Sequence, residues 1–140
     1  MNDRELLELA ATAVGYDISH SMNTERLMLT PSVDALLVRK DGKLVTTGWN
    51  PLIDDGDALR LAVELKLAIF PPEGDDGDFA VASVPDGVLD DFGETWIQES
   101  VKDGDKLAAT RRAIVCAAAE IGKAMPHMPD SNHRPLGDGA

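Results

Sequence analysis

Five residues in two parts of the chain have side chains suited to binding an anionic ligand. They are an indole, an amide and three guanidinium groups in or beside predicted helices: Trp49, Asn50, Arg60, Arg111 and Arg112. Arginine pairs with phosphate oxygens, an indole ring stacks on a nucleobase, and free backbone N–H groups at a helix start attract anions. We favour a simpler, structural interpretation, with a core tryptophan, a turn-forming asparagine, and arginines that pair with carboxylates of the acidic segment or of a helix start.

Catalytic and metal-binding chemistry has weaker support in this sequence. Cys116 is the only cysteine, it falls on an alanine-rich predicted helix, and only His20 lies outside the predicted tail to act as its base. Asp54, Asp55 and Asp57 could ligate a divalent cation, but capping explains carboxylates at a helix start more simply. The GxGxxG and GxxxxGK signatures of dinucleotide and P-loop sites are absent. We therefore expect no enzyme, no catalytic residue, no metal and no cofactor.

The net charge of -12 is concentrated in one part of the chain. Residues 73–105 contain eleven carboxylates and one lysine, whereas the rest of the sequence is nearly neutral. Such a charge repels nucleic acids and anionic membranes, and no apolar run approaches the roughly 20 residues of a membrane span. The acidic N-terminus also lacks the basic start of a secretory signal. We expect solvated loops over this segment and a cytosolic protein.

Capping signals and apolar periodicity predict the first two helices. The first spans about 3–14, because Asn2 and Glu5 form a capping pattern before an apolar run. The second follows the carboxylates of 54–57 and continues to about Lys66. Its predicted core face consists of apolar residues at helical spacing: Ala58, Leu59, Ala62, Val63 and Leu65.

A third helix is predicted from a cap at Asp103 or Asp105 to about Met125. Its many alanines give it little bulk, so another element should approach its backbone closely. The following residues 126–140 are rich in proline, glycine and aspartate and predict a disordered tail. The chain is thus expected to be a single domain over residues 1–125.

Strand signals lie between these helices. The clearest is a hairpin over 33–40 and 43–49, joined by the turn-forming pair Asp41-Gly42, and further runs lie at 67–70, 79–84 and 94–101. Trp96 is the expected anchor of the last run, and residues 16–31 predict an irregular connection. The order α-β-β-α-β-β-β-α by itself suggests helices that cover a mostly antiparallel sheet.

Three stretches carry a resemblance to a known family. They are ELLELAATAVGY at 5–16, WNPLIDDGDALRLA at 49–62 and ATRRAIVCAAAEIG at 109–122. Over roughly residues 3–124 the chain resembles the phage ABA sandwich domain family, small proteins of bacteriophages and prophages without an assigned activity. The resemblance implies a three-layer α/β/α sandwich in a single domain, with a mixed or mostly antiparallel sheet and three main helices, the helices lying on both sides of the sheet. Cys116 departs from the family pattern, which commonly has arginine there.

The resemblance and the lack of a catalytic set predict a small phage-encoded, non-enzymatic binding or host-interaction protein in the cytoplasm of the host bacterium. A first alternative is an anti-defence sponge that sequesters a nucleotide-like host signal through the group around Trp49. A second is an acidic DNA mimic, in which residues 73–105 inhibit a host DNA-binding protein. The expected partner is an unknown host protein or a small nucleotide-like ligand, with no direct contact to nucleic acid or membrane. A homo-oligomer is compatible with the sequence.

Overall fold

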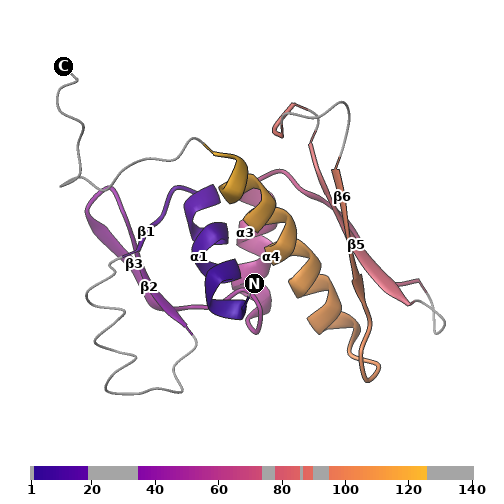
Figure 1. Cartoon of the computed structure of the whole chain (residues 1–140). Coiled ribbons are helices and arrows are strands. Elements are labelled where there is room, and N and C mark those ends of the chain that lie inside the picture. Colours follow the sequence, from indigo (N-terminus) through magenta and orange to yellow (C-terminus); the bar gives the residue numbers. More distant parts are fainter. Residues whose placement is uncertain (1, 19–34, 74–77, 86, 90–94, 126–140) are drawn as a thin grey trace.

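The structure is a computed structural model that describes residues 2–18, 35–73, 78–85, 87–89 and 95–125. Two antiparallel sheets lie on either side of a layer of helices (Figure 1). The helices are α1 (Asp3–Ala13), α3 (Asp55–Glu64) and α4 (Lys106–Ala124). Sheet A contains β1 (Asp17–Ile18), β2 (Leu36–Lys40) and β3 (Lys43–Trp49) in that order. Sheet B contains β4 (Ala68–Phe70), β5 (Phe79–Val84) and β6 (Thr95–Ser100), also in chain order.

The α/β sandwich class expected from the sequence is confirmed, as one domain with three helices and antiparallel strands. The layers follow the order sheet, helices, sheet, so a single helical layer separates two sheets rather than enclosing one. The reason lies in α4, which has apolar residues on two sides. Because each side must be covered, α4 packs against the other helices on one side and against sheet B on the other.

The buried residues form two clusters that meet at α4. The first joins sheet A to the three helices; its larger members are Leu6, Leu7, Leu36, Trp49, Leu61 and Ile114. The second joins sheet B to the opposite side of α4 and is built mainly from small side chains: Ala80, Ala82, Val84, Ala109, Ala113, Ala117 and Ile121. Small residues on both surfaces let the helix lie close to the sheet.

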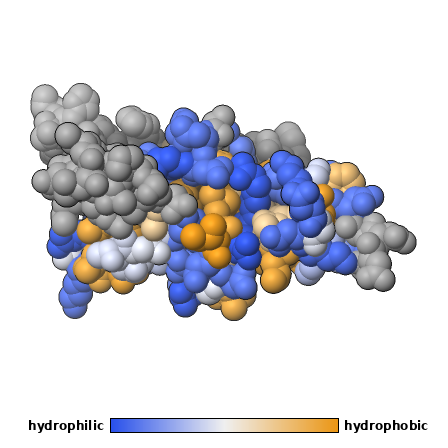
Figure 2. Space-filling view, turned by 90° about the horizontal axis from the view of Figure 1, so that it is seen from below, coloured by the Kyte–Doolittle hydropathy of each residue, from blue (hydrophilic) through white to orange (hydrophobic). Residues whose placement is uncertain are grey.

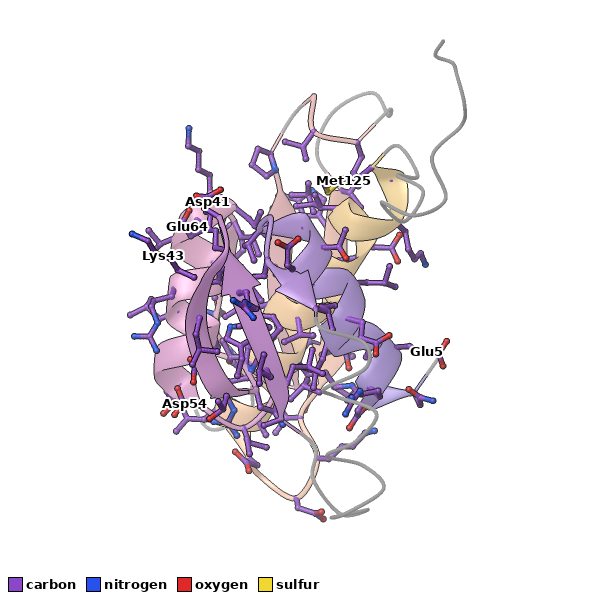
Figure 3. All side chains as sticks on the ribbon, turned by 90° about the vertical axis from the view of Figure 1, so that its left-hand side faces the viewer. Glu5, Asp41, Lys43, Asp54, Glu64 and Met125 are labelled. Carbon is purple, nitrogen blue, oxygen red and sulfur yellow. The ribbon has the colours of Figure 1, made fainter. Side chains whose placement is uncertain are left out.

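The three helices point in the same direction. Figure 3 labels Glu5 and Asp54 near the starts of α1 and α3 at the lower end, and Glu64 and Met125 near the ends of α3 and α4 at the upper end. Figure 2 views the lower end, where hydrophilic residues surround smaller areas of hydrophobic surface. Parallel helices place the positive ends of their dipoles at the same end of the molecule, and carboxylates near those ends stabilise them.

Local capping begins the first two helices as the sequence predicts. The Asn2 side chain accepts a hydrogen bond from the Glu5 N–H (2.8 Å), and the Glu5 carboxylate accepts one from the Asn2 N–H (3.3 Å). In α3 the Asp54 carboxylate accepts from the Asp57 N–H at 2.8 Å. These bonds satisfy N–H groups that have no partner within the helix.

The predicted core face of α3 is wrong at two positions. Leu59 and Val63 are 61% and 67% exposed, whereas Leu61, absent from the prediction, is 2% exposed. The buried stripe follows Ala58, Leu61 and Ala62. Apolar residues lie on more than one side of this short helix, so periodicity alone did not fix which side faces the core.

The predicted hairpin forms between β2 and β3. Asp41 and Gly42 have φ values of 53° and 77°, and Lys40 pairs with Lys43, as a two-residue turn requires. Sheet A has an additional strand, β1, within the stretch expected to be irregular, and it pairs antiparallel with β2. Two residues carry too little pattern to predict a strand, and pairing with β2 supplies the stabilisation.

Helix α4 starts where the sequence indicates and packs as closely as its composition predicts. The Asp105 carboxylate caps it by accepting a hydrogen bond from the Ala108 N–H (2.9 Å). Gly122 lies so close to α1 that a Cβ atom there would clash with the carbonyl group of Leu9. A glycine at this point therefore permits the contact between the two helices.

Several predictions fall outside the described residues. They concern the tail at 126–140, His20, the first residues of the hairpin at 33–34 and most of the acidic turn at 74–77. Within the described part of the chain, no helix is long and apolar enough to cross a membrane.

Candidate functional site

Trp49 lies in the core. Its side chain is 3% exposed, and its ring makes an edge-to-face contact with Tyr16, with centroids 5.6 Å apart at an interplanar angle of 83°. Both residues pack in the first buried cluster. The indole face is therefore occupied by protein and does not present a stacking surface to a ligand.

Asn50 is 3% exposed and shapes the turn between β3 and α3. Its side-chain oxygen accepts a hydrogen bond from the Leu52 N–H (2.9 Å), and its backbone N–H donates to the Asp57 carboxylate (3.0 Å). The other oxygen of Asp57 accepts from Arg60 at 2.9 Å. Asp57 thus ties the end of a strand to the first turns of the following helix.

Arg111 joins α4 to the start of α3. Its Nε donates to the Leu52 carbonyl oxygen (2.8 Å), and its Nη1 lies 2.7 Å from the Asp55 carboxylate. The arginine side chain is 16% exposed. This pairing with a helix-start carboxylate is the one that the structural interpretation predicts.

Arg112 joins α4 to the start of α1 and to sheet B. Its Nη1 lies 3.0 Å from the Asp3 carboxylate, and its Nε lies 3.5 Å from the Glu99 carboxylate. The hydrogen bond with Asp3 is the main reason that the pKa of Arg112 is raised above its usual value. The two adjacent arginines therefore bind different neighbours instead of converging on one point.

The five candidate residues consequently do not share an open site among the described residues. Trp49 and Asn50 are buried, and Arg60, Arg111 and Arg112 each contact at least one carboxylate. An anionic ligand would have to displace these carboxylates or approach them against their charge. The contacts support an architectural role for the group.

Two surface hollows among the described residues do not suit a nucleotide either. A hollow of about 80 Å³ beside the start of α4 is lined in part by Glu99, Lys102, Asp105 and Arg112, a volume below that of typical small-molecule pockets. Another of about 340 Å³, between α1 and β1, is lined by Glu5, Glu8, Leu9, Thr12 and Ile18. Its two carboxylates and lack of a base disfavour an anion.

Cys116 is a poor nucleophile in this environment. Burial, followed by the charge of Glu99, raises the pKa of its thiol to about 12. The Sγ atom donates a hydrogen bond to the Glu99 carboxylate at 3.5 Å. Because the thiolate is the reactive form, this thiol is inert near neutral pH. In the described ranges, no three His, Cys, Asp or Glu residues gather to hold a metal ion.

The outer face of sheet B carries a group of exposed aromatic side chains. We call it the aromatic face; it turns away from the helices, which contact the opposite side of the sheet (Figure 1). Phe70, Phe79 and Trp96 are 46%, 48% and 55% exposed. The strand register places these residues on the same side as Ala68, Val81, Ser83, Gln98 and Ser100.

Phe70 and Trp96 stack on one another across the central strand. Their ring centroids are 5.2 Å apart with an interplanar angle of 27°. Phe70 belongs to β4 and Trp96 to β6, whereas Ser83 of β5 is paired with Trp96 and is 1% exposed. The rings therefore lean toward each other over a small residue of β5 and form a preorganised hydrophobic surface.

Sequence reasoning missed this surface because it treated Trp96 only as the anchor of its strand. The side chain is more than half exposed, so Trp96 does not anchor the strand in the core. A signal was present in β5, where small residues at Ala80 and Ala82 alternate with the larger Phe79 and Val81. An alanine-rich helix requires small residues on the facing side of a sheet, which assigns the large ones to the outside.

Comparison of the chain with protein-family models, with curated proteins and with solved structures finds no match in any of the three.

Proposed function

We propose that this chain is a non-enzymatic binding module that contacts another protein through the aromatic face of sheet B. The stacked pair of Phe70 and Trp96, half exposed beside Phe79, is the observation that carries the proposal. Aromatic residues, and tryptophan in particular, are enriched at the energetic centres of protein interfaces. Several exposed aromatic residues on one sheet face lower the solubility of a protein. A binding role explains why they are exposed here.

The composition of the aromatic face fits an interface centre with a polar margin. Two polar residues of the edge strand β6, Gln98 and Ser100, lie on the same side of the sheet as the rings. A buried aromatic side chain removes about 150–250 Å² from water, so three half-exposed rings supply a substantial part of the roughly 800 Å² that each partner buries in a standard interface. The rings are already stacked, so little conformational entropy is lost on binding.

The geometry of the remaining candidates supports a role without catalysis. Cys116 is protonated near neutral pH, and Arg60, Arg111 and Arg112 are engaged by carboxylates. The nucleotide-sponge alternative therefore has no open, cationic site to support it in the described residues. Calorimetry against cyclic and ADP-ribose-type nucleotides is expected to show no heat of binding.

The resemblance of residues 5–16, 49–62 and 109–122 to phage ABA sandwich proteins supports a bacteriophage or prophage origin. On this proposal the partner is a host protein, and the two meet in the cytoplasm of the infected bacterium. The absence of a catalytic constellation among the described residues favours an effect by occupancy, in which the bound host protein is blocked or redirected.

Site-specific photo-crosslinking tests the proposal. A benzophenone amino acid at Gln98, which is exposed on the aromatic face and outside the stacked pair, is expected to cross-link one discrete protein in a bacterial lysate. The same probe at Leu59, exposed on α3, serves as the control and should not give that product. The further change Trp96→Ser should abolish the product at position 98.

Three results would overturn the proposal. One is a product that survives Trp96→Ser, and another is the absence of any product specific to position 98. The third is measurable turnover of a substrate that disappears when a defined set of residues is mutated, because this would show an enzyme. Circular dichroism of each variant confirms that the exposed substitutions leave the fold intact.

A further inference from the structure

The aromatic face lies in the most acidic part of the chain. Residues 73–105, which include β5 and β6, carry eleven carboxylates and one lysine. Two of these carboxylates adjoin the aromatic residues: Asp78 immediately precedes Phe79, and Glu73 follows Phe70 by three residues. Both are exposed. Both lie beyond the Phe79 end of the sheet, so a partner that covers this end of the aromatic face meets their negative charge.

This charge restricts what can bind. A second copy of the chain would bring two acidic segments together, and a nucleic acid or an acidic peptide would add phosphates or carboxylates to the same region. An uncharged apolar partner would take Glu73 and Asp78 partly out of water without giving them a counterion. A basic partner avoids both penalties and is attracted over a distance.

From these observations we infer that the partner brings an arginine-bearing, basic segment to the aromatic face. The inference rests on the proposed binding function and specifies the chemistry of its partner. A guanidinium group is planar, stacks on the open face of an indole or phenyl ring and pairs with a carboxylate through two parallel hydrogen bonds. Trp96, Phe70 and Phe79 offer the rings, and Asp78 and Glu73, beyond the Phe79 end of the sheet, offer carboxylates to other arginines of the same segment. Lysine has neither the planar stacking surface nor the bidentate geometry.

A matched peptide series tests the inference. The probe is a blocked ten-residue peptide of alternating arginine and leucine, compared with versions that carry citrulline, lysine or glutamate in place of arginine. Citrulline keeps the shape of arginine without its charge. Affinities come from fluorescence anisotropy of labelled peptides at two salt concentrations.

The arginine peptide is expected to bind at least about tenfold more tightly than the citrulline peptide, and to weaken as salt is raised. The lysine peptide should bind more weakly than the arginine peptide, and the glutamate peptide should not bind. Trp96→Leu and the double change Asp78→Asn with Glu73→Gln should each lower the affinity for the arginine peptide several-fold. Leu59→Ala, on exposed surface of α3, should leave it unchanged.

Equal affinity for the arginine and citrulline peptides would overturn the inference. Binding of the arginine peptide that is unaffected by Trp96→Leu would also overturn it, because such binding is nonspecific attraction to an acidic chain. These failures are distinguishable from failure of the proposed function. A Trp96-dependent cross-link from position 98 together with equal peptide affinities refutes the charge preference alone. Loss of the Trp96-dependent cross-link refutes the proposed function itself.

Discussion

At the scale of single residues, Arg111 and Arg112 show why two adjacent cations need not form one site. Successive residues of a helix point about 100° apart, so side chains next to each other in sequence face different neighbours. Arg111 binds Asp55 at the start of α3, and Arg112 binds Asp3 at the start of α1. The pair therefore aligns the starts of two helices with α4.

For the candidate site, the sequence predicts the local role of single residues but not which distant residue each of them contacts. The turn-forming Asn50 and the pairing of an arginine with a helix-start carboxylate follow from the chemistry of those residue types, and both are present. Which arginine reaches which helix depends on how three helices pack, and no local pattern encodes that. Trp96 illustrates the same limit, because an exposed tryptophan and a buried one have the same sequence signal.

Cys116 is expected to react slowly with iodoacetamide in the folded protein. Because its pKa is raised to about 12, only a very small fraction is thiolate at about pH 8.5. Glu99→Gln removes the neighbouring negative charge, so the pKa should fall toward its usual value and the alkylation rate should rise. Unfolding in urea is the control and should restore the rate of a free thiol. Rapid alkylation of the folded wild-type protein would contradict this account.

The same thiol predicts how stability depends on alkaline pH. A pKa raised on folding means that the folded state holds its proton more tightly, so the stabilising contribution is complete below the unfolded value of 9.0 and is lost as pH rises toward about 12. Other groups ionise in this range, so the measurement is the difference between wild type and Cys116→Ala in urea unfolding. The wild type should lose more free energy of unfolding over that window; parallel curves would refute the linkage.

At the scale of elements, the sequence predicted what local signals specify. Helix starts at Asn2, Asp54 and Asp105 and the hairpin turn at Asp41-Gly42 depend on residues close together in the chain. Strand β1 and the order of the layers depend on contacts between distant segments. The alanine content of α4 predicts close approach by a neighbour, but it does not show that neighbours pack on two sides of the helix, as they do.

Gly122→Ala is expected to destabilise the protein by about 1–3 kcal/mol, because the new methyl group must push α1 and α4 apart at the Leu9 carbonyl. The sign of the change in stability tests this explanation, because a glycine-to-alanine change within a helix otherwise stabilises by about 0.5–1 kcal/mol. Urea unfolding measures the change. Gly48→Ala, where no atom lies within 4 Å of the added Cβ, is the matched control. An unchanged or increased stability for Gly122→Ala would show that the helices separate at no cost.

At the scale of the whole molecule, the protein presents an apolar sheet face on a strongly acidic chain. The aromatic face favours self-association, whereas the net charge of -12 opposes it. The salt concentration determines which effect is larger, because the electrostatic screening length falls from about 10 Å at 0.1 M to about 3 Å at 1 M.

We therefore expect a monomer in sedimentation velocity at low ionic strength and measurable self-association at about 1 M sodium chloride. Trp96→Ser should reduce the association at high salt, and Leu59→Ala should not. A stable dimer at low ionic strength would be incompatible with the charge argument and would favour a second copy as the occupant of the aromatic face.

The position of α4 between both buried clusters also bears on how the chain is made. Each sheet comes from one continuous half of the chain, so its strands are synthesised together. Both clusters, however, include residues of the last described helix. A nascent chain that has emerged from the ribosome as far as β6 can pair its strands but cannot close either core. Folding is therefore expected to finish only after α4 has been released, as a late and concerted step.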